Sequence, residues 1–174
     1  HVRNACVHVG PDGALRSVYR KIHLFDVDLP DGTTLAESDT VEPGDTPVAT
    51  ETAFGVLGLS VCYDVRFPEL YRKLVDLGAI ALAIPAAFTL TTGKDHWHVL
   101  LRARAIEAQA YVLAAAQTGH HYGRRVSYGH ALICDPWGTV LAECGEGEGV
   151  AVANVDPEVV ARVRRAVPSL AHRR

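Results

Sequence analysis

The chain has 174 residues, and its 17 Lys and Arg against 20 Asp and Glu leave a formal net charge of −3. With 48% hydrophobic and 21% charged residues, the composition is that of a globular domain rather than of a disordered or fibrous chain. No apolar run approaches the roughly 20 residues of a membrane span, and no basic block offers a surface for nucleic acid, so we expect neither partner. The sequence contains no Met, and we expect further residues to precede His1 in the natural protein.

The four cysteines, Cys6, Cys62, Cys134 and Cys144, form no CxxC pair and no dense framework. Cysteine usage of this kind is typical of a reducing compartment, and we therefore expect a cytoplasmic protein. No low-complexity segment, internal repeat or linker divides the chain, so residues 1–174 are predicted to form a single domain.

The first predicted element is a hairpin, in which residues 2–9 and 14–19 pair across the Gly-Pro-Asp-Gly turn at 10–13. Residues 26–55 follow, and their Asp, Gly, Thr, Pro and Glu content predicts a long irregular loop. Long loops inside a domain are commonly functional or mobile, so polar residues in this one are candidates for a site.

The centre of the chain alternates buried strands with helices. Residues 56–62 form a short apolar run of the kind expected for a strand covered on both faces. A helix is predicted from Pro68 to about residue 77, because leucines recur at helical spacing and Gly78 can follow its end. A second buried strand is predicted at 79–84.

A second helix is predicted over residues 95–109, with Asp95 as its N-cap and an apolar stripe along one side. Residues 111–116 form a third buried strand. The order strand, helix, strand, helix, strand predicts a parallel sheet with right-handed crossover connections.

The last third of the chain is expected to return to antiparallel structure. Short strands are predicted at 130–134, 139–143 and 150–155, with turns rich in Gly or containing Asp-Pro between them. Residues 157–166 predict a terminal helix that begins at a proline. The predicted fold class is therefore α/β, with parallel and antiparallel strands mixed in its sheets.

Cys62 is the first candidate for chemistry, because it lies at the carboxyl end of a buried strand, a few residues before a helix. Ligands bind at such strand ends in open α/β sheets, and a helix N-terminus lowers the pKa of a nearby thiol. The alternative is an inert buried cysteine. Lys21 ends a strand of the hairpin, where a lysine either protects a sheet edge or stabilises a thiolate and an oxyanion.

The sequence around Glu37 is, on local grounds, typical of an exposed loop residue. Two histidine pairs, His96 with His98 and His120 with His121, raise the question of a metal. Neither pair has the i, i+4 spacing of a zinc pair on a helix, and no cysteine or carboxylate completes a recognisable ligand set. We therefore expect no metal and, since glycine-rich phosphate loops are absent, no nucleotide cofactor.

Six segments together carry a resemblance to a known family. They are 19–24 (YRKIHL), 58–70 (GLSVCYDVRFPEL), 87–93 (AFTLTTG), 96–97 (HW), 101–107 (LRARAIE) and 135–138 (DPWG). The chain resembles the nitrilase, or carbon–nitrogen hydrolase, superfamily, and within it the Nit-type amidases, from near residue 4 to the end. The resemblance implies an α-β-β-α sandwich truncated here at its N-terminus, with subunits that form homodimers or larger homo-oligomers.

The resemblance also implies hydrolysis of a small amide to an acid and ammonia, without metal or organic cofactor. Cys62 matches the nucleophile of the family, Lys21 its lysine and Glu37 its second glutamate. Lys21 and the backbone N–H of Tyr63 would stabilise the oxyanion formed when the thiolate attacks. The general-base glutamate of the family has no match in the chain and is expected upstream of His1.

Three further residues match positions that bind substrate in Nit-type amidases. Arg66 matches the arginine that meets the carboxylate of the substrate, a task that suits a bidentate guanidinium. The alternative for Arg66 is a pair with Asp64 or with a carboxylate at a helix end. Phe88 and Thr92 match positions in the substrate pocket.

Two substrates stay open within this resemblance. Residues 117–121, 127–130 and 167–174 resemble amidases that act on deaminated glutathione, which we favour. Residues 87–93 are closer to ω-amidases, which act on α-ketoglutaramate. A homologue that binds carboxylates without catalysis, having lost its general base, is the alternative from another functional class.

Overall fold

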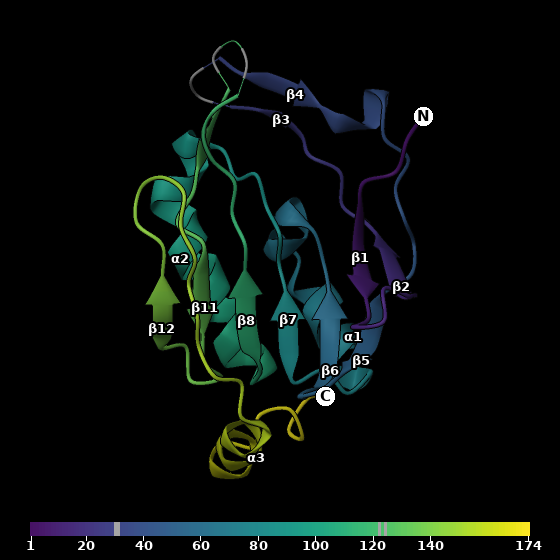
Figure 1. The fold of residues 1–174 in the computed structure, drawn as a ribbon, viewed down its shortest axis with the longest axis vertical. Helices are drawn as coiled ribbons and strands as arrows, with labels where there is room; N and C mark the ends of the chain where they lie inside the picture. The colour runs from purple at the N-terminus through teal and green to yellow at the C-terminus, as the bar shows by residue number, and fades with distance from the viewer. Residues whose placement is uncertain (30–31, 122, 124) are drawn as a thin grey trace.

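A six-stranded mixed sheet forms the centre of the fold (Figure 1). The computed structural model describes residues 1–29, 32–121, 123 and 125–174. In spatial order the strands are β12 (Val140–Glu143), β11 (Leu132–Cys134), β8 (Tyr111–Ala114), β7 (Ala81–Ala83), β6 (Gly55–Leu59) and β5 (Val48–Thr52). The three central strands β6, β7 and β8 are parallel, and the outer strands are antiparallel to their neighbours. The predicted α/β class with mixed strands is confirmed.

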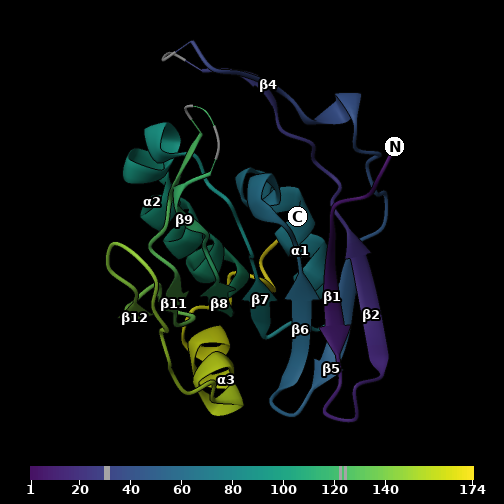
Figure 2. The same ribbon diagram turned by 45° about the horizontal axis from the view of Figure 1, so that its top comes forward.

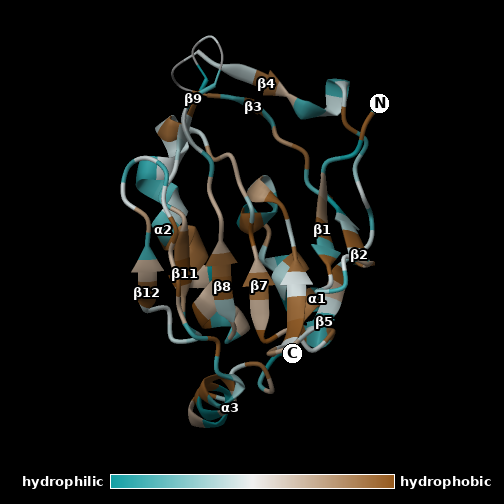
Figure 3. Cartoon of the chain, in the orientation of Figure 1, coloured by the Kyte–Doolittle hydropathy of each residue, from teal (hydrophilic) through white to brown (hydrophobic). Residues whose placement is uncertain are grey.

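Helices α1 (Pro68–Asp76) and α2 (Leu90–Ala108) connect the parallel strands and pack side by side on one face of the sheet (Figures 1 and 2). Their apolar sides, with Leu74 and Trp97 fully buried, meet alternate residues of the strands such as Leu82. Successive strand residues face opposite sides of a sheet, so only every second one points towards these helices. The central strands β7, β8 and β11 are accordingly among the most hydrophobic segments (Figure 3).

Helix α3 (Pro157–Ala166) packs against the other set of alternate strand residues. Its Val160 is buried in a second apolar cluster with Ala81 and Tyr111, which are neighbours in the register of β7 and β8. The Asp156 side chain caps the helix by accepting a hydrogen bond of 2.9 Å from the Glu158 N–H. Both faces of the parallel strands are thus covered where α3 lies.

The predicted N-terminal hairpin is present as β1 (Ala5–Val9) and β2 (Leu15–Arg20), which are paired in antiparallel register. Gly13 has φ +78° in the turn, a conformation that glycine adopts without a Cβ penalty. Strand β2 lies beside β5, where the Ser17 hydroxyl donates to the Thr50 hydroxyl over 2.9 Å. The hairpin therefore stands next to the edge of the central sheet (Figure 2).

The prediction of an irregular loop over residues 26–55 is wrong. This segment contains a short hairpin of β3 (Asp26–Asp28) and β4 (Thr34–Ala36), the 3-10 turn η1 (Glu37–Asp39) and the edge strand β5. The hairpin strands have three residues each, of which only the middle one is partly buried, so they carry no apolar run that a sequence pattern could show.

Helix α2 begins at Leu90, five residues before the predicted start, and Asp95 is not its cap. Asp95 lies on the exposed helix surface and pairs with Lys94. Gly93 lies inside the helix, although a glycine in the sequence favours a helix break. Only glycine fits at this position, because a Cβ there would lie 2.4 Å from the Tyr128 Cβ.

The predicted strand at 150–155 is also wrong, because these residues join no ladder and Val150 and Val152 stay largely exposed. A hairpin that the sequence analysis did not predict pairs β9 (Thr118–His120) with β10 (Val126–Tyr128). Of the helices in the described part of the chain, none combines the length and the apolar character needed to cross a membrane.

Candidate active site

A cavity of about 760 Å³ opens at the carboxyl ends of the three parallel strands. Parallel strands end at one edge of a sheet, and ligand crevices form there. The segments that follow β6, β7 and β8 (61–62, 85–87 and 115–117) form one wall of the cavity. Its other lining residues are Asn4, Ala5, Lys21, Phe25, Leu35, Ala36, Glu37, Thr40, Val41, Thr89 and Arg125.

Cys62 stands at a sharp turn between β6 and the 3-10 turn η2 (Cys62–Arg66). Its backbone has φ +51°, which is uncommon for any residue other than glycine. The Cys62 N–H donates a hydrogen bond of 2.9 Å to the Pro85 carbonyl, which fixes the turn against the segment after β7. Helix α1 begins directly afterwards at Pro68, and the thiol of Cys62 lines the cavity.

Asp64 holds this turn against the end of β2. Its carboxylate is fully buried and accepts hydrogen bonds from the Tyr19 hydroxyl at 2.7 Å and from the Val61 N–H at 2.8 Å. Its other oxygen accepts from the backbone N–H of His23 at 3.1 Å and contacts the His23 ring nitrogen Nδ1 at 2.8 Å. Lys21 lies between Tyr19 and His23 in the sequence, and Cys62 follows Val61. Because Asp64 joins these segments, Lys21 and Cys62 come to the same cavity.

Lys21 and Glu37 form an ion pair beside the thiol. The Lys21 Nζ lies 2.5 Å from the Glu37 Oε2, and only 3% of the lysine side chain and 18% of the glutamate side chain are exposed. The Asn4 side-chain amide donates to the Glu37 Oε1 at 3.1 Å, and the Phe25 N–H donates to the Oε2 at 2.8 Å. Three donors therefore fix the carboxylate, which in turn fixes the ammonium of Lys21.

The pKa values of Cys62 and Glu37 are shifted in opposite directions. Burial raises the pKa of the Cys62 thiol above its ordinary value, and the charge of Lys21 and a backbone hydrogen bond from Ala87 offset this only in part. The expectation of a lowered pKa is therefore not met at Cys62, because desolvation outweighs the charge of Lys21 and the hydrogen bond from Ala87.

Burial alone would also raise the pKa of Glu37, but the hydrogen bonds from Lys21, Asn4 and Phe25 outweigh it and hold this pKa below its usual value. A carboxylate that is stabilised in this way is a weak base. Glu37 is thus suited to orient Lys21 rather than to accept the proton of the thiol.

A narrow recess beside Cys62 contains the predicted substrate-binding residues Phe88 and Thr92. The Arg66 guanidinium lies over the Phe88 ring, 5.1 Å from its centre, and 3.3 Å from the His96 Nδ1. Arg66 does not line the large cavity within the described structure, and it pairs there with no carboxylate, so the alternative of a pair with Asp64 is wrong.

The family model for carbon–nitrogen hydrolases matches residues 1–165 of the chain. The chain belongs to the carbon–nitrogen hydrolase family. Among its relatives, the deaminated glutathione amidase of Synechocystis sp. is 55% identical over 172 residues, which cover 98% of this chain and 63% of that protein. The ω-amidase NIT3 of Saccharomyces cerevisiae is 41% identical, over 99% of this chain and 60% of that protein.

The solved structure of the Caenorhabditis elegans NitFhit protein matches this carbon–nitrogen hydrolase chain with a TM-score of 0.94 and 47% identity. The match covers 100% of this chain and 42% of the NitFhit chain. The fold expected from the resemblance is confirmed by this match. The chain spans less than two thirds of the length of the curated relatives above.

The carbon–nitrogen hydrolase chain brings Cys62, Lys21 and Glu37 to one cavity, as the resemblance implies. Sequence reasoning missed Asn4 and Asp64, which hold these three in place. Asn4 gave no signal that could have identified it, because its partner is 33 positions away. Asp64 follows Cys62 by two residues in the quoted motif. A charged side chain so close to a buried strand was a signal that it takes part in a hydrogen-bond network.

Proposed function

We propose that the protein containing this chain hydrolyses a small carboxylate-bearing amide to an acid and ammonia through a cysteine thioester. The observation that carries this proposal is the meeting of the Cys62 thiol and the Lys21–Glu37 pair in one cavity of substrate size. A nucleophile beside a fixed cation is what acyl transfer requires, since negative charge develops on the carbonyl oxygen. The names of the amidase relatives support the same reaction class.

The proposed reaction begins when the sulfur of Cys62 attacks the amide carbonyl as its proton passes to a base. The oxyanion of the tetrahedral intermediate is held by the ammonium of Lys21 and the backbone N–H of Tyr63. Collapse of the intermediate breaks the C–N bond, and the leaving nitrogen takes a proton and departs as ammonia. Water then attacks the thioester, and the acid and the free thiol are released.

A second carboxylate is needed as the general base in this scheme. Among the cavity-lining residues that the structure describes, Glu37 is the one carboxylate, and its lowered pKa and its pairing with Lys21 make it a poor proton acceptor. Burial raises the pKa of the Cys62 thiol, which increases the need for a base that takes the thiol proton during attack. We propose that a glutamate outside these 174 residues supplies it.

The substrate that we favour is deaminated glutathione, with α-ketoglutaramate as the alternative. Both carry carboxylates, and two arginines support such a ligand: Arg125 lines the cavity, and Arg66 lies over the ring of Phe88, which lines the adjoining recess. The two relatives described above bear the names of these two activities. Phe88 and Thr92 would contact the substrate from the recess.

The test is ammonia release by the whole natural protein with each of the two substrates. Cys62→Ala should abolish release, whereas Cys6→Ala should retain it, because Cys6 packs against the core and does not line the cavity. Undiminished release by Cys62→Ala would refute the proposed nucleophile. Absence of release by the wild type, together with binding of both carboxylates, would favour a homologue that binds without catalysis.

We further propose that the protein acts in the cytoplasm as a homodimer or larger homo-oligomer. All four cysteines are free thiols, which supports a reducing compartment. The assembly rests on the family resemblance. Light scattering of the whole protein tests it, and a mass equal to one subunit would refute it.

A further inference from the structure

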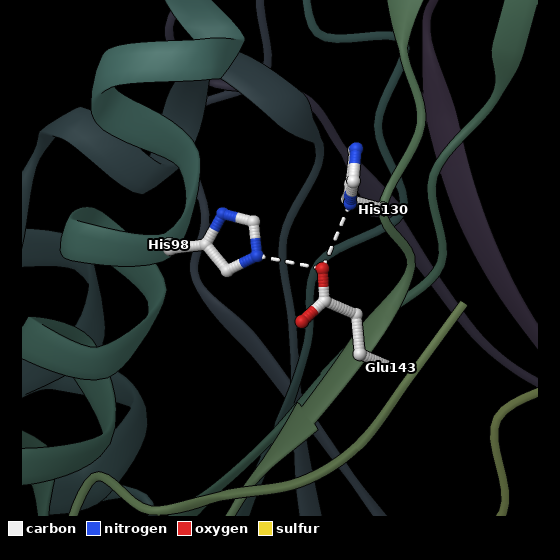
Figure 4. A group of neighbouring side chains, drawn as sticks. All are labelled: His98, His130 and Glu143. Carbon is white, nitrogen blue, oxygen red and sulfur yellow. Dashed lines mark hydrogen bonds and ion pairs between the residues drawn. The ribbon is translucent and has the colours of Figure 1, made fainter. Parts of the chain in front are cut away.

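Three side chains of types that commonly bind metal ions meet at one point, away from the cavity that Cys62 lines (Figure 4). His98 comes from α2, His130 precedes β11, and Glu143 ends β12. The His98 Nε2 and the His130 Nδ1 each lie 2.8 Å from the same carboxylate oxygen, Glu143 Oε1. Among the residues that the structure describes, no other three His, Cys, Asp or Glu side chains bring their ligand atoms within 4.8 Å of one another.

The position of His130 is fixed by its surroundings. Its backbone has φ +58°, a conformation uncommon outside glycine, and its carbonyl accepts a hydrogen bond of 2.8 Å from the Trp97 Nε1. The Tyr128 ring stacks on the imidazole with 4.3 Å between the ring centres. The edge of His98 also meets Tyr128, at 6.2 Å between centres. Ligands held in this way lose little freedom when an ion binds.

The group is open to solvent and carries the charge that a cation needs. The side chains are 32%, 21% and 33% exposed for His98, His130 and Glu143, so an ion and its waters can reach them. The carboxylate is ionised at neutral pH. Within the described ranges, Glu143 forms ion pairs with the two histidines and with no lysine or arginine.

We propose that His98, His130 and Glu143 bind a divalent transition-metal ion such as Zn²⁺, with water completing the coordination. Two imidazoles and one carboxylate form a ligand set that such ions accept, at about 2.0–2.2 Å from each ligand atom. Mg²⁺ and Ca²⁺ prefer oxygen ligands and should bind poorly. Each ring can move its proton to its other nitrogen, so the atoms now hydrogen-bonded to Glu143 become free to ligate.

The proposed ion would fasten α2 to the edge strand β12 and would take no part in amide hydrolysis, since none of its ligands lines the cavity with Cys62. Sequence spacing could not show this group, because Glu143 lies 45 positions from His98 and 13 from His130.

The test uses the whole natural protein, stripped with a chelator and titrated with Zn²⁺ by calorimetry. The variant His98→Gln keeps a donor towards Glu143 but removes a metal ligand. It should bind one equivalent fewer per chain, or bind it at least ~100-fold more weakly, since loss of an outer-shell partner alone costs ~10- to 100-fold. His172→Gln removes an exposed histidine elsewhere and should match the wild type.

X-ray absorption at the zinc edge of the loaded wild type needs no variant and distinguishes this group from the cysteines. Two imidazoles with oxygen ligands and no sulfur are expected. Sulfur ligation, or equal Zn²⁺ binding by wild type, His98→Gln and Glu143→Gln, would overturn the proposal. So would tight binding of Mg²⁺ at the same ligands.

Discussion

Lys21 is a buried charge whose stability depends on a single partner. Its side chain is 3% exposed, and its ammonium pairs with Glu37. An isolated ammonium in such a place would be strongly destabilising, whereas a paired one that is also hydrogen-bonded can be retained. Lys21 and Glu37 therefore act as a unit, and removing either side chain leaves the other without its ionic partner.

Replacing Lys21 by Met keeps the volume of the side chain and removes its charge. We expect Lys21→Met to lower kcat by ~10²-fold or more, as loss of an oxyanion donor does. Steady-state kinetics of the whole protein measure this, with Lys73→Met on the exposed side of α1 as the matched control. An effect confined to KM would instead make Lys21 a residue that only binds substrate.

The pair also predicts a dependence of stability on pH. The folded state holds the pKa of Glu37 below its ordinary value of 4.5, so its carboxylate stabilises the fold above that pH and loses this contribution as the pH falls through the lowered pKa. Glu37→Gln should reduce the free energy of unfolding at neutral pH by on the order of 3 kcal/mol.

Denaturant unfolding at several pH values tests this prediction. The difference between wild type and Glu37→Gln should shrink below pH 4.5. The exposed Glu51→Gln variant serves as a control that should show no such trend. A difference that stays constant down to the acid transition would contradict the stabilising role of the ionised carboxylate.

Arg66 can either bind the carboxylate of the substrate or support the turn that follows β6, and a conservative substitution distinguishes these two roles. If it binds the carboxylate of the substrate, Arg66→Lys keeps the charge and loses the planar fork, at a cost of about 2 kcal/mol, or ~30-fold in kcat/KM. The loss should fall on deaminated glutathione or α-ketoglutaramate and spare a neutral amide such as butyramide. An equal loss on both kinds of substrate would show that Arg66 supports the turn through Phe88 and His96.

Helix α2 contains a glycine whose replacement should reverse the usual rule for helices. Alanine normally stabilises a helix interior by about 1 kcal/mol over glycine. At Gly93 the new Cβ would lie 2.4 Å from the Tyr128 Cβ, so Gly93→Ala should destabilise the protein by about 1–3 kcal/mol. Thermal unfolding measures the change, with Gly145→Ala as the control, since no atom lies within 4 Å of the Cβ there. A raised midpoint for Gly93→Ala would contradict the close packing of β10 on α2.

The strands and helices around the site were predictable where their own residues carried the pattern. The apolar runs of β6, β7 and β8 and the proline at the start of α1 placed Cys62 at a strand end. The start of α2 was not predictable. The sequence shows a glycine at position 93, but the side chain that requires it, Tyr128, belongs to β10. Glu37 was identified only through the family resemblance, since its buried partner Lys21 is 16 positions away.

The two ends of the parallel strands have different roles in the molecule. The carboxyl ends of the parallel strands meet the cavity, and the opposite ends are fixed by α3 (Figure 1). Arg164 of α3 donates to the Ala79 carbonyl over 2.9 Å and to the Gln109 carbonyl over 3.3 Å, just before β7 and β8 begin. One end of the strands is thus rigidly anchored, so that the loops at the other end can carry function.

The buried carboxylate of Asp64 ties the end of β2 and the turn after β6 into one cooperative unit. Neither segment can open by itself, because the same side chain closes hydrogen bonds to Tyr19, His23 and Val61. A local fluctuation that frees one of them removes a hydrogen bond from a carboxylate that is buried in the interior, which opposes the fluctuation. Cys62 and Lys21 therefore take up and leave their places in the cavity together, and a partly unfolded molecule would hold neither of them there.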